Sequence, residues 1–346
     1  MSLRNNPVLR TSGLSVRADV RAALVVALLA LAAAGAGVLL LGTGDFPLAP
    51  GDVVATLLGH GEPGQEFIVR ELRLPRLLVA LLVGACLGLA GAVFQSVSRN
   101  PLGSPDVIGF GQGSVVGALT VIVLFQGDAV QVALGSLAGG LVTGVLIYAL
   151  AWRRGVHGYR LVLVGIGAAA MLTAVNGYLF TKADIVDAAR ALVWLTGSLN
   201  GRDWAQVWPL LWLCALLMPL ILAYARPLRM LELGDDAAGA LGVPVERTRL
   251  VLMTSAVLLT AAATAAAGPV SFVALTAPQL ARRLTRSPGP GLLPAAVMGA
   301  ALLTAADWVA QRAFGDAQLP VGVVTGVLGG CYLLWLLIGE RRAGRI

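Results

Sequence analysis

The chain has 346 residues, of which 58% are hydrophobic and only 12% are charged. Soluble domains carry about 25% charged residues and disordered chains are poor in apolar residues, so both classes are excluded. The formal net charge is +7, but the basic residues lie beside apolar runs, which indicates membrane topology rather than a nucleic-acid partner. We therefore expect an all-α polytopic membrane protein that lies in a lipid bilayer.

Apolar runs of about 20 residues, the length of a membrane-crossing helix, organise the chain. We expect one transmembrane domain over residues 1–346 with ten transmembrane helices. In chain order the predicted spans are 22–41, 76–97, 107–126, 130–151, 161–180, 205–225, 249–267, 270–281, 292–310 and 319–338. With both termini in the cytoplasm, 18 basic residues fall in inside segments and seven in outside segments. This bias supports a cytoplasmic (inner) membrane protein in that orientation.

The first predicted span follows a cytoplasmic N-terminal segment, residues 1–21, that is rich in arginine. Such a start is similar to a secretory signal peptide. The apolar run is about 20 residues long, however, whereas the apolar region of a signal peptide has about 7–15. We expect this helix to be retained in the mature protein.

Glycines recur at a spacing of four in several spans. This spacing places them on one face of a helix, where two helix backbones can approach closely. The rows are Gly84 and Gly88; Gly109, Gly113 and Gly117; Gly135 and Gly139; Gly322, Gly326 and Gly330. They predict a compact bundle.

The longest predicted cytoplasmic loop, residues 227–248, has the pattern of a short structured helix. Asp235 and Asp236 suit a helix N-terminus, because the helix dipole is positive there. Gly242 is placed to cap the helix, and Pro244 prevents its continuation. A surface helix of small residues suits the groove of a partner protein, and the alternative is a connector that lies on the membrane.

The eighth span is too short to cross a bilayer. It has about a dozen residues between Pro269 and Arg282 and contains Pro278. At 1.5 Å per residue it reaches roughly 18 Å, against a hydrocarbon core about 30 Å thick. We expect other helices to shield it, or one of its ends to open into a watery vestibule.

The sequence lacks the residues that ATP hydrolysis, metal binding and disulfide formation would require. The single lysine, Lys182, is not part of a phosphate-binding loop, so we expect no ATPase site in this chain. The three cysteines lie in separate apolar runs, which predicts neither a metal site nor a disulfide framework. We identify no catalytic residues and expect no enzyme.

The spans contain almost none of the ionisable residues that an ion-driven carrier would need. An ion-coupled carrier normally keeps ionisable groups at mid-membrane. Here Asp307 lies toward the outer end of its span, Asp106 lies at the inner mouth of another, and the mid-membrane polar groups are neutral. We expect Asn176 and Thr173 to line a pathway, and a partner to supply the energy.

Five blocks of sequence resemble known importers. The stretch from Asp235 to Gly242 resembles the coupling loop of ABC-importer permeases. Four further blocks resemble the iron–siderophore and cobalamin permease family (FecCD-type): Arg73-Leu74-Pro75-Arg76, Asn100-Pro101-Leu102-Gly103-Ser104-Pro105, Gly268–Leu275 with Ala277-Pro278, and Leu319–Thr325. The stretch Trp194–Asn200 resembles the ferric-enterobactin branch of that family.

The resemblance implies a type II ABC importer permease fold and a set of partners. These are a second permease subunit, expected to be a paralogue that forms a heterodimer, two ATP-binding subunits and an extracytoplasmic solute-binding protein. ATP and magnesium would bind to the ATP-binding subunits, so this chain would bind no cofactor directly.

The resemblance also implies roles for individual residues. For ATPase coupling these are Glu232, Gly234, Asp235, Asp236, Ala237, Ala238, Leu241 and Gly242. For docking of the binding protein they are Arg73, Arg76 and Arg312, whose alternative role is topology or lipid-headgroup contact. For the cytoplasmic gate they are Asn100 and Leu102, whose alternative role is a turn.

Two sites, with three residues in all, depart from the family pattern. A second gate would precede Arg160, but Gly158 and Tyr159 do not preserve its pair of small hydroxyl residues. Gln279 stands where many relatives have histidine.

The function implied is the transmembrane permease subunit of an ATP-driven importer for a ferric siderophore of the catecholate, enterobactin-like kind. The nearest alternative is the same machine for cobalamin or haem. An ion-coupled secondary transporter and a receptor or scaffold without transport are the alternatives from other classes.

Overall fold

The computed structural model describes residues 8–11, 14–17, 19–106, 108–152, 158–313 and 318–342. One short antiparallel hairpin precedes the first helix, with β1 (Val8–Thr11) paired to β2 (Leu14–Arg17). The sequence did not predict this hairpin. Beyond it, the regular structure of the described residues is helical.

A helix occupies each of the ten predicted spans. These helices are α1 (Val20–Gly42), α4 (Leu74–Ser98), α5 (Phe110–Phe125), α6 (Ala129–Ala151), α7 (Gly158–Lys182), α9 (Trp204–Ala223), α12 (Val245–Ala267), α13 (Val273–Thr285), α14 (Leu292–Arg312) and α15 (Val321–Arg342). Within the described residues, seven helices are long and apolar enough to cross a membrane. The multi-span helical fold is confirmed, and the count of ten crossings stays a prediction.

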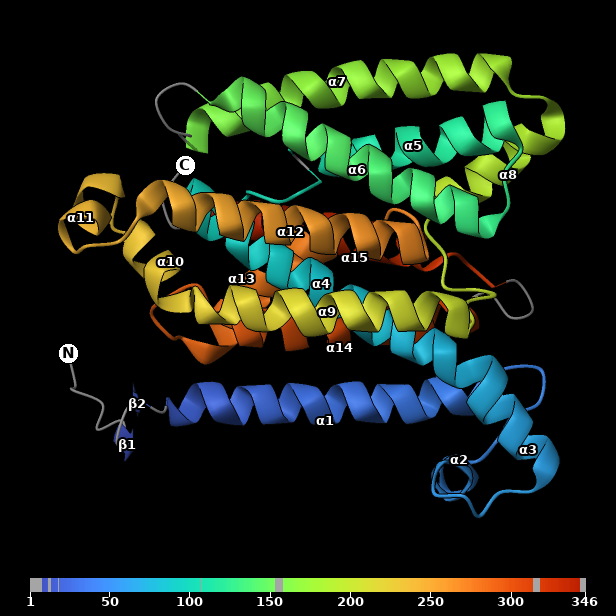
Figure 1. The fold of residues 1–346 in the computed structure, drawn as a ribbon. Coiled ribbons are helices and arrows are strands. Elements are labelled where there is room, and N and C mark those ends of the chain that lie inside the picture. Colours follow the sequence, from blue (N-terminus) through green and yellow to red (C-terminus); the bar gives the residue numbers. More distant parts are fainter. Residues whose placement is uncertain are drawn as a thin grey trace.

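Shorter helices lie at the two ends of the bundle (Figure 1). One end, which we term the α11 end, carries α10 (Ala225–Leu231) and α11 (Asp235–Ala240). The opposite end, the α2 end, carries α2 (Pro50–Leu57), α3 (Pro63–Phe67), a π-helical turn η1 (Ile68–Arg73) and α8 (Ile185–Leu195). Helix α8 was not predicted, because its residues lie in the outside segment between the predicted spans 161–180 and 205–225.

Helix α4 runs through the centre of the molecule, and α7 lies at its periphery (Figure 1). In the apolar stretch that contains α4, 78% of residues are buried, compared with 17% for α7. Glycines explain how closely α4 packs: a Cβ atom at Gly84 or Gly88 would collide with the backbone of α14. Gly117 and Gly135 bring α5 and α6 together in the same way.

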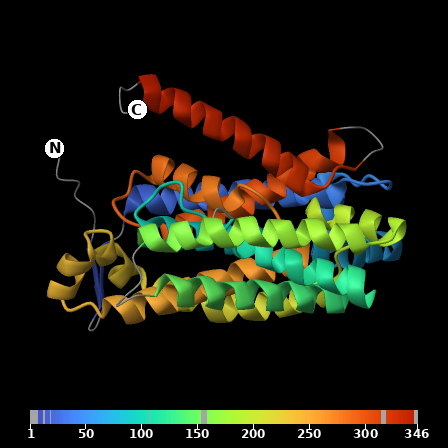
Figure 2. The same cartoon turned by 90° about the horizontal axis from the view of Figure 1, so that it is seen from above.

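The predicted glycine packing is therefore confirmed for these rows, but not for every glycine. Gly322 packs tightly against the carbonyl of Thr196, whereas Gly326 and Gly330 face open space. Helix α15, on which they lie, diverges from the bundle axis (Figure 2). The periphery of the molecule is thus more loosely packed than its centre.

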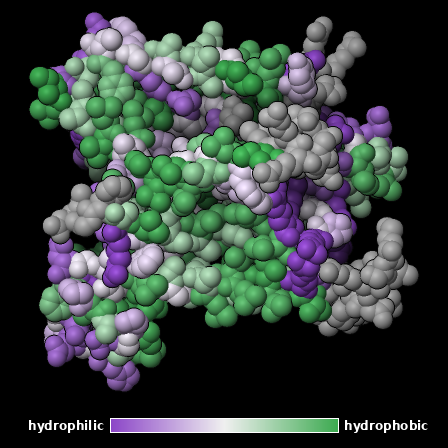
Figure 3. Space-filling model, turned by 180° about the vertical axis from the view of Figure 1, so that it is seen from behind, coloured by the Kyte–Doolittle hydropathy of each residue, from purple (hydrophilic) through white to green (hydrophobic). Residues whose placement is uncertain are grey.

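The surface has the hydropathy expected of a membrane protein. Hydrophobic side chains dominate the middle of the face shown in Figure 3, and hydrophilic side chains gather toward both ends. The short helix α13, which has 13 residues and contains Pro278, lies against α4 and α14 with most of its first half buried. The expectation that other helices shield this segment is confirmed.

Candidate functional site

The predicted coupling loop forms two short helices at the α11 end. Asp235 and Asp236 stand in the first turn of α11, where the helix dipole favours negative charge. Gly242 follows with a φ of +82°, and the Val243 N–H donates to the Ala238 carbonyl at 3.0 Å. These features close the helix as the sequence predicted, because glycine adopts a positive φ without strain.

The predicted coupling residues divide into exposed and internal groups. Asp236, Ala237, Leu241 and Gly242 are exposed, and Leu241 is 60% exposed, so they form a surface that another protein can contact. Ala238 is buried. Asp235 accepts two hydrogen bonds from the Arg249 guanidinium, at 2.8 and 2.9 Å. Arg249, which sequence analysis did not single out, is only 3% exposed, so Asp235 helps to hold a buried charge.

Glu232 follows α10 and contacts the end of α4. Its Oε1 atom accepts a hydrogen bond from Ser96 Oγ at 2.7 Å and lies 3.6 Å from the Arg282 guanidinium on α13. Arg282 also donates to Ser96 Oγ at 3.0 Å. Three elements that are distant in sequence therefore meet at one polar cluster.

The predicted gate residues lie in the loop that joins α4 to α5, which we term the α4–α5 loop. Arg99 ends α4 in a left-handed conformation, and the Leu102 N–H donates to Asn100 Oδ1 at 2.9 Å. Leu102 is 45% exposed. Asn100 thus shapes a turn, and the gate role of both residues stays a prediction. Residues 153–157, which precede Gly158 and Tyr159 at the second gate position, lie outside the described residues.

Gln279 on α13 is bonded to this loop. Its Nε2 atom donates to Gln95 Oε1 at 2.7 Å and to the Pro101 carbonyl at 3.1 Å. Gln95 is 2% exposed and donates in turn to the Leu275 carbonyl. The glutamine that departs from the family pattern therefore has a physical role in this chain, because it ties α13 to α4 and to the carbonyl beside Leu102.

At the α2 end, the three predicted docking arginines already have partners within the chain. Arg73 donates to the carbonyls of Leu41 and Phe46, both at 2.7 Å. The Arg312 guanidinium lies over the Trp308 ring, 5.6 Å from its centroid. These two arginines are anchored to the α2 end by side-chain contacts.

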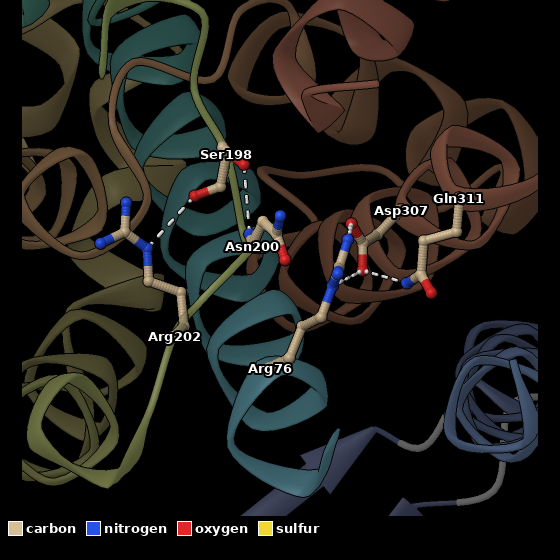
Figure 4. Close-up of polar contacts among 6 residues, drawn as sticks. All are labelled: Arg76, Ser198, Asn200, Arg202, Asp307 and Gln311. Atoms are coloured by element: carbon tan, nitrogen blue, oxygen red, sulfur yellow. Dashed lines mark hydrogen bonds and ion pairs between the residues drawn. The ribbon is translucent and has the colours of Figure 1, made fainter. Parts of the chain in front are cut away.

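Arg76 is the most constrained of the three. Its Nε and Nη2 atoms donate to the two carboxylate oxygens of Asp307, both at 2.8 Å (Figure 4). Asp307 is 0% exposed and also accepts from Gln311. A bidentate pair of this kind holds the guanidinium in one orientation. Arg76 is therefore an internal ion-pair partner, and its docking role stays a prediction.

A cavity of about 330 Å³, lined by both polar and apolar residues, opens beside this pair. Arg73, Arg76 and Arg202 contribute to its lining, together with Asn200 from the loop between α8 and α9. Arg202 donates to the Ser198 carbonyl at 3.2 Å, and the Asn200 N–H donates to Ser198 Oγ (Figure 4). Arg202 was not predicted as a site residue, because the other residues of this cavity, apart from those of its own loop, come from three segments that are distant in the sequence.

The two predicted pathway residues differ in their environment on α7. Thr173 is exposed, and its hydroxyl donates to the Ala169 carbonyl of its own helix. Asn176 is 8% exposed, and its amide donates to Gln112 on α5 at 3.2 Å. Thr173 thus faces outward from the chain, whereas Asn176 faces the bundle, and the pathway role of both stays a prediction.

This arrangement is that of a multi-span helical membrane protein, with the exposed short helix α11 at one end and arginines at the other. The FecCD transport family model matches residues 21–339, and the chain belongs to this family. The chain is thus a permease rather than an enzyme.

Two curated relatives and one solved structure are similar along nearly their whole length. The ferric enterobactin transport system permease protein FepG of Escherichia coli (strain K12) is 50% identical over 91% of this chain and 96% of its own. The iron(3+)-hydroxamate import system permease protein FhuG of Bacillus subtilis (strain 168) is 38% identical over 86% and 91%.

The solved structure is described as an inward-facing conformation of a metal-chelate type ABC transporter. It has a TM-score of 0.82 and 27% identity, and the match covers 92% of this chain and 99% of that one. It confirms the predicted type II importer fold.

Proposed function

We propose that the chain is the permease subunit of an ATP-driven importer that carries a ferric siderophore, of the enterobactin kind, across the cytoplasmic membrane. The observation that carries the proposal is the 50% identity with a ferric enterobactin permease over 91% of the chain. Hydrolysis of ATP is assigned to separate subunits, so this chain binds neither ATP nor magnesium.

The two ends of the bundle suit different partners. Two cytoplasmic ATP-binding subunits would dock at the α11 end, which the exposed residues of α11 support, and both termini would then lie in the cytoplasm. The arginine-lined cavity at the α2 end favours an extracytoplasmic solute-binding protein with acidic side chains. Charge pairing of this kind mainly sets docking orientation and association rate.

The exposed apolar surfaces of α7 and α15 favour a second permease subunit. Met171 and Tyr178 on α7 are 74% and 60% exposed, and Val327 on α15 is 62% exposed. A pathway between two such chains would be lined by neutral groups such as Thr173. This suits a large solute better than a narrow charged pore would.

The test is uptake by proteoliposomes that contain this chain, a second permease and the ATP-binding subunits, with the binding protein added outside. We expect ATP-dependent uptake of labelled ferric enterobactin, which an uncoupler of the proton gradient does not abolish. Uptake of cobalamin or haem in its place would assign another substrate. Uptake that needs the gradient but not ATP would reject the proposal.

Asp236 provides a test of the coupling surface. Because its carboxylate is exposed, Asp236→Arg should reduce uptake without reducing the amount of folded protein in the membrane. Asp235 is unsuitable for this purpose, since its loss would also leave Arg249 with fewer partners. Normal uptake by Asp236→Arg would count against the role of α11.

A further inference from the structure

The polar cluster at the α11 end lies between the proposed coupling surface and the predicted gate. Ser96 and Gln95 are neighbours in the last turn of α4, and both are 2% exposed. Gln279 and Arg282 lie three residues apart on α13, so they share one face of that helix. This face of α13 contacts the last turn of α4 at two residues: Gln279 contacts Gln95, and Arg282 contacts Ser96.

One half of the cluster reaches the coupling loop. Arg282 donates to Ser96 Oγ, and Ser96 Oγ donates to Glu232 Oε1, directly after α10. The side chains of Arg282 and Glu232 are 29% and 27% exposed, so this ion pair is only partly screened by water. A displacement of α10 therefore acts on Ser96 and Arg282.

The other half of the cluster reaches the α4–α5 loop. The Gln279 amide donates to both Gln95 Oε1 and the Pro101 carbonyl, while Gln95 donates to the Leu275 carbonyl. The Pro101 carbonyl directly precedes Leu102. The Gln279 side chain holds this carbonyl, which takes no part in the backbone hydrogen bonds of a helix. The position of the loop therefore depends on the position of α13.

We infer that Gln279, Gln95, Ser96, Arg282 and Glu232 form a relay that makes the α4–α5 loop move together with the coupling loop. This inference rests on the proposed function, which supplies the ATP-binding subunits that displace α10 and α11. These are positioning residues: their proposed role is to move the α4–α5 loop and not to bind the solute or the nucleotide. Helix α13 suits this role because it is short and contacts both α4 and α14.

The test follows the gate loop directly. A cysteine replaces Leu102 in a chain whose exposed native cysteine is removed by Cys331→Ser, because Cys86 and Cys214 are buried. The rate of maleimide labelling from the cytoplasmic side is measured in the assembled transporter, without nucleotide and with ATP trapped by vanadate. With the relay intact, we expect the two rates to differ by at least about fivefold.

Two relay variants and one control are compared. Gln279→Leu removes both amide hydrogen bonds at nearly constant volume, and Ser96→Ala removes the hydroxyl that joins Arg282 to Glu232. In both we expect the labelling rates in the two nucleotide states to become equal. ATP hydrolysis should continue while the number of solute molecules carried per ATP falls. Arg286→Gln, at an exposed arginine directly after α13, should behave as the parent chain does.

Rescue separates a relay from a merely structural contact. Arg282→Glu should lose the nucleotide dependence, and combining it with Glu232→Arg should restore it, because the opposite charges meet again. Variants that keep the nucleotide-dependent labelling and normal uptake per ATP overturn the inference. Equal losses of ATP hydrolysis and uptake, with reduced membrane abundance, also overturn it, since they assign the cluster to stability.

Failure of the proposed substrate gives a different result. The labelling experiment needs ATP but no siderophore, so it reports on the relay even if the parent chain does not carry ferric enterobactin. Loss of ferric enterobactin uptake in the parent chain, with nucleotide-dependent labelling intact, rejects the substrate and retains the relay.

Discussion

At the scale of single residues, the Arg76–Asp307 pair is the most buried charge interaction at the α2 end. Removing one member of a buried pair leaves an uncompensated charge. We expect Asp307→Asn to lower the free energy of unfolding by about 3 kcal/mol, within the range of 3–5 kcal/mol observed for broken buried pairs. Thermal unfolding of the purified chain in detergent measures this effect.

The matched control is the Arg70–Glu66 pair, whose side chains are 40% and 43% exposed. Exposed pairs contribute about 0–1 kcal/mol, so Arg70→Met should change stability little. A double variant, Arg76→Met with Asp307→Leu, should recover much of the loss, because apolar replacements remove both charges together. Equal effects of Asp307→Asn and Arg70→Met would show that burial does not set the strength of the pair.

Asp106 makes the stability of the folded chain depend on pH. Burial raises the pKa of its carboxyl group from 3.8 to about 6, and its Oδ2 atom is buried without a hydrogen-bond partner. A carboxyl whose pKa is higher in the folded state holds its proton more tightly there. This contribution to stability is therefore present at low pH and is lost as pH rises between these two values.

We expect Asp106→Asn to remove this contribution. The difference in melting temperature between the parent chain and the variant should change across the window from 3.8 to about 6 and stay constant above it. Melting curves in detergent at a series of pH values measure this difference. If the difference in melting temperature were constant at all pH values, a group other than Asp106 would be responsible for the pH dependence.

The residue scale is also where sequence analysis reached its limit. Arg76, Asp307 and Gln279 were all noted in the sequence, but their partners lie 231 and 184 residues away. A pattern of charge reveals that a residue is unusual, while its partner depends on the packing of helices that are distant in the chain. The coupling helix was predictable because its signals, the acidic first turn and Gly242, are local.

At the scale of helices, glycine contacts set how closely α5 approaches α6. A side chain at Gly117 would meet the backbone of Gly135, so Gly117→Leu forces the two helices apart. We expect a loss of about 1–3 kcal/mol, the usual effect of overpacking, together with lower membrane abundance. Thermal unfolding and quantification in membranes measure both.

Gly177 on α7 is the control, because a Cβ atom there meets nothing within 4 Å. Gly177→Ala should leave the fold intact and raise stability by up to about 1 kcal/mol, since alanine favours the helix more than glycine does. If Gly117→Leu were tolerated as well as Gly177→Ala, close backbone approach would not be what holds α5 and α6 together.

The length of the apolar runs predicted these helices with little error, whereas the short elements were harder to predict. The predicted eighth span began at residue 270, but α13 begins at Val273 because Phe272 adopts a left-handed conformation with a φ of +67°. Helix α8 was missed, and the hairpin of β1 and β2 had no distinct signal. Local backbone geometry of this kind is set by tertiary contacts more than by composition.

At the scale of the whole molecule, the orientation in the membrane is the main open prediction. Cysteines are introduced at Asp236 in α11 and at Val54 in α2, in the background of Cys331→Ser. We expect a membrane-impermeant maleimide to label Asp236→Cys only from the cytoplasmic side and Val54→Cys only from the outside. Both residues are exposed, so access depends on the side of the membrane alone.

The reverse labelling pattern would place α11 outside and would contradict the distribution of 18 inside and seven outside basic residues. Labelling of both positions from one side would instead show that one fewer helix than predicted crosses the membrane between α2 and α11.

The contrast between the tightly packed centre and the open periphery has an evolutionary consequence. Helices α4, α14, α5 and α6 are fixed by backbone contacts that tolerate few substitutions, while 17% burial leaves α7 with few contacts inside its own chain. Mutations on α7 can therefore accumulate without unfolding the chain. Because the proposed pathway residue Thr173 lies on α7, we expect a chimaera that exchanges α7 between two relatives to fold and to take the substrate preference of the donor.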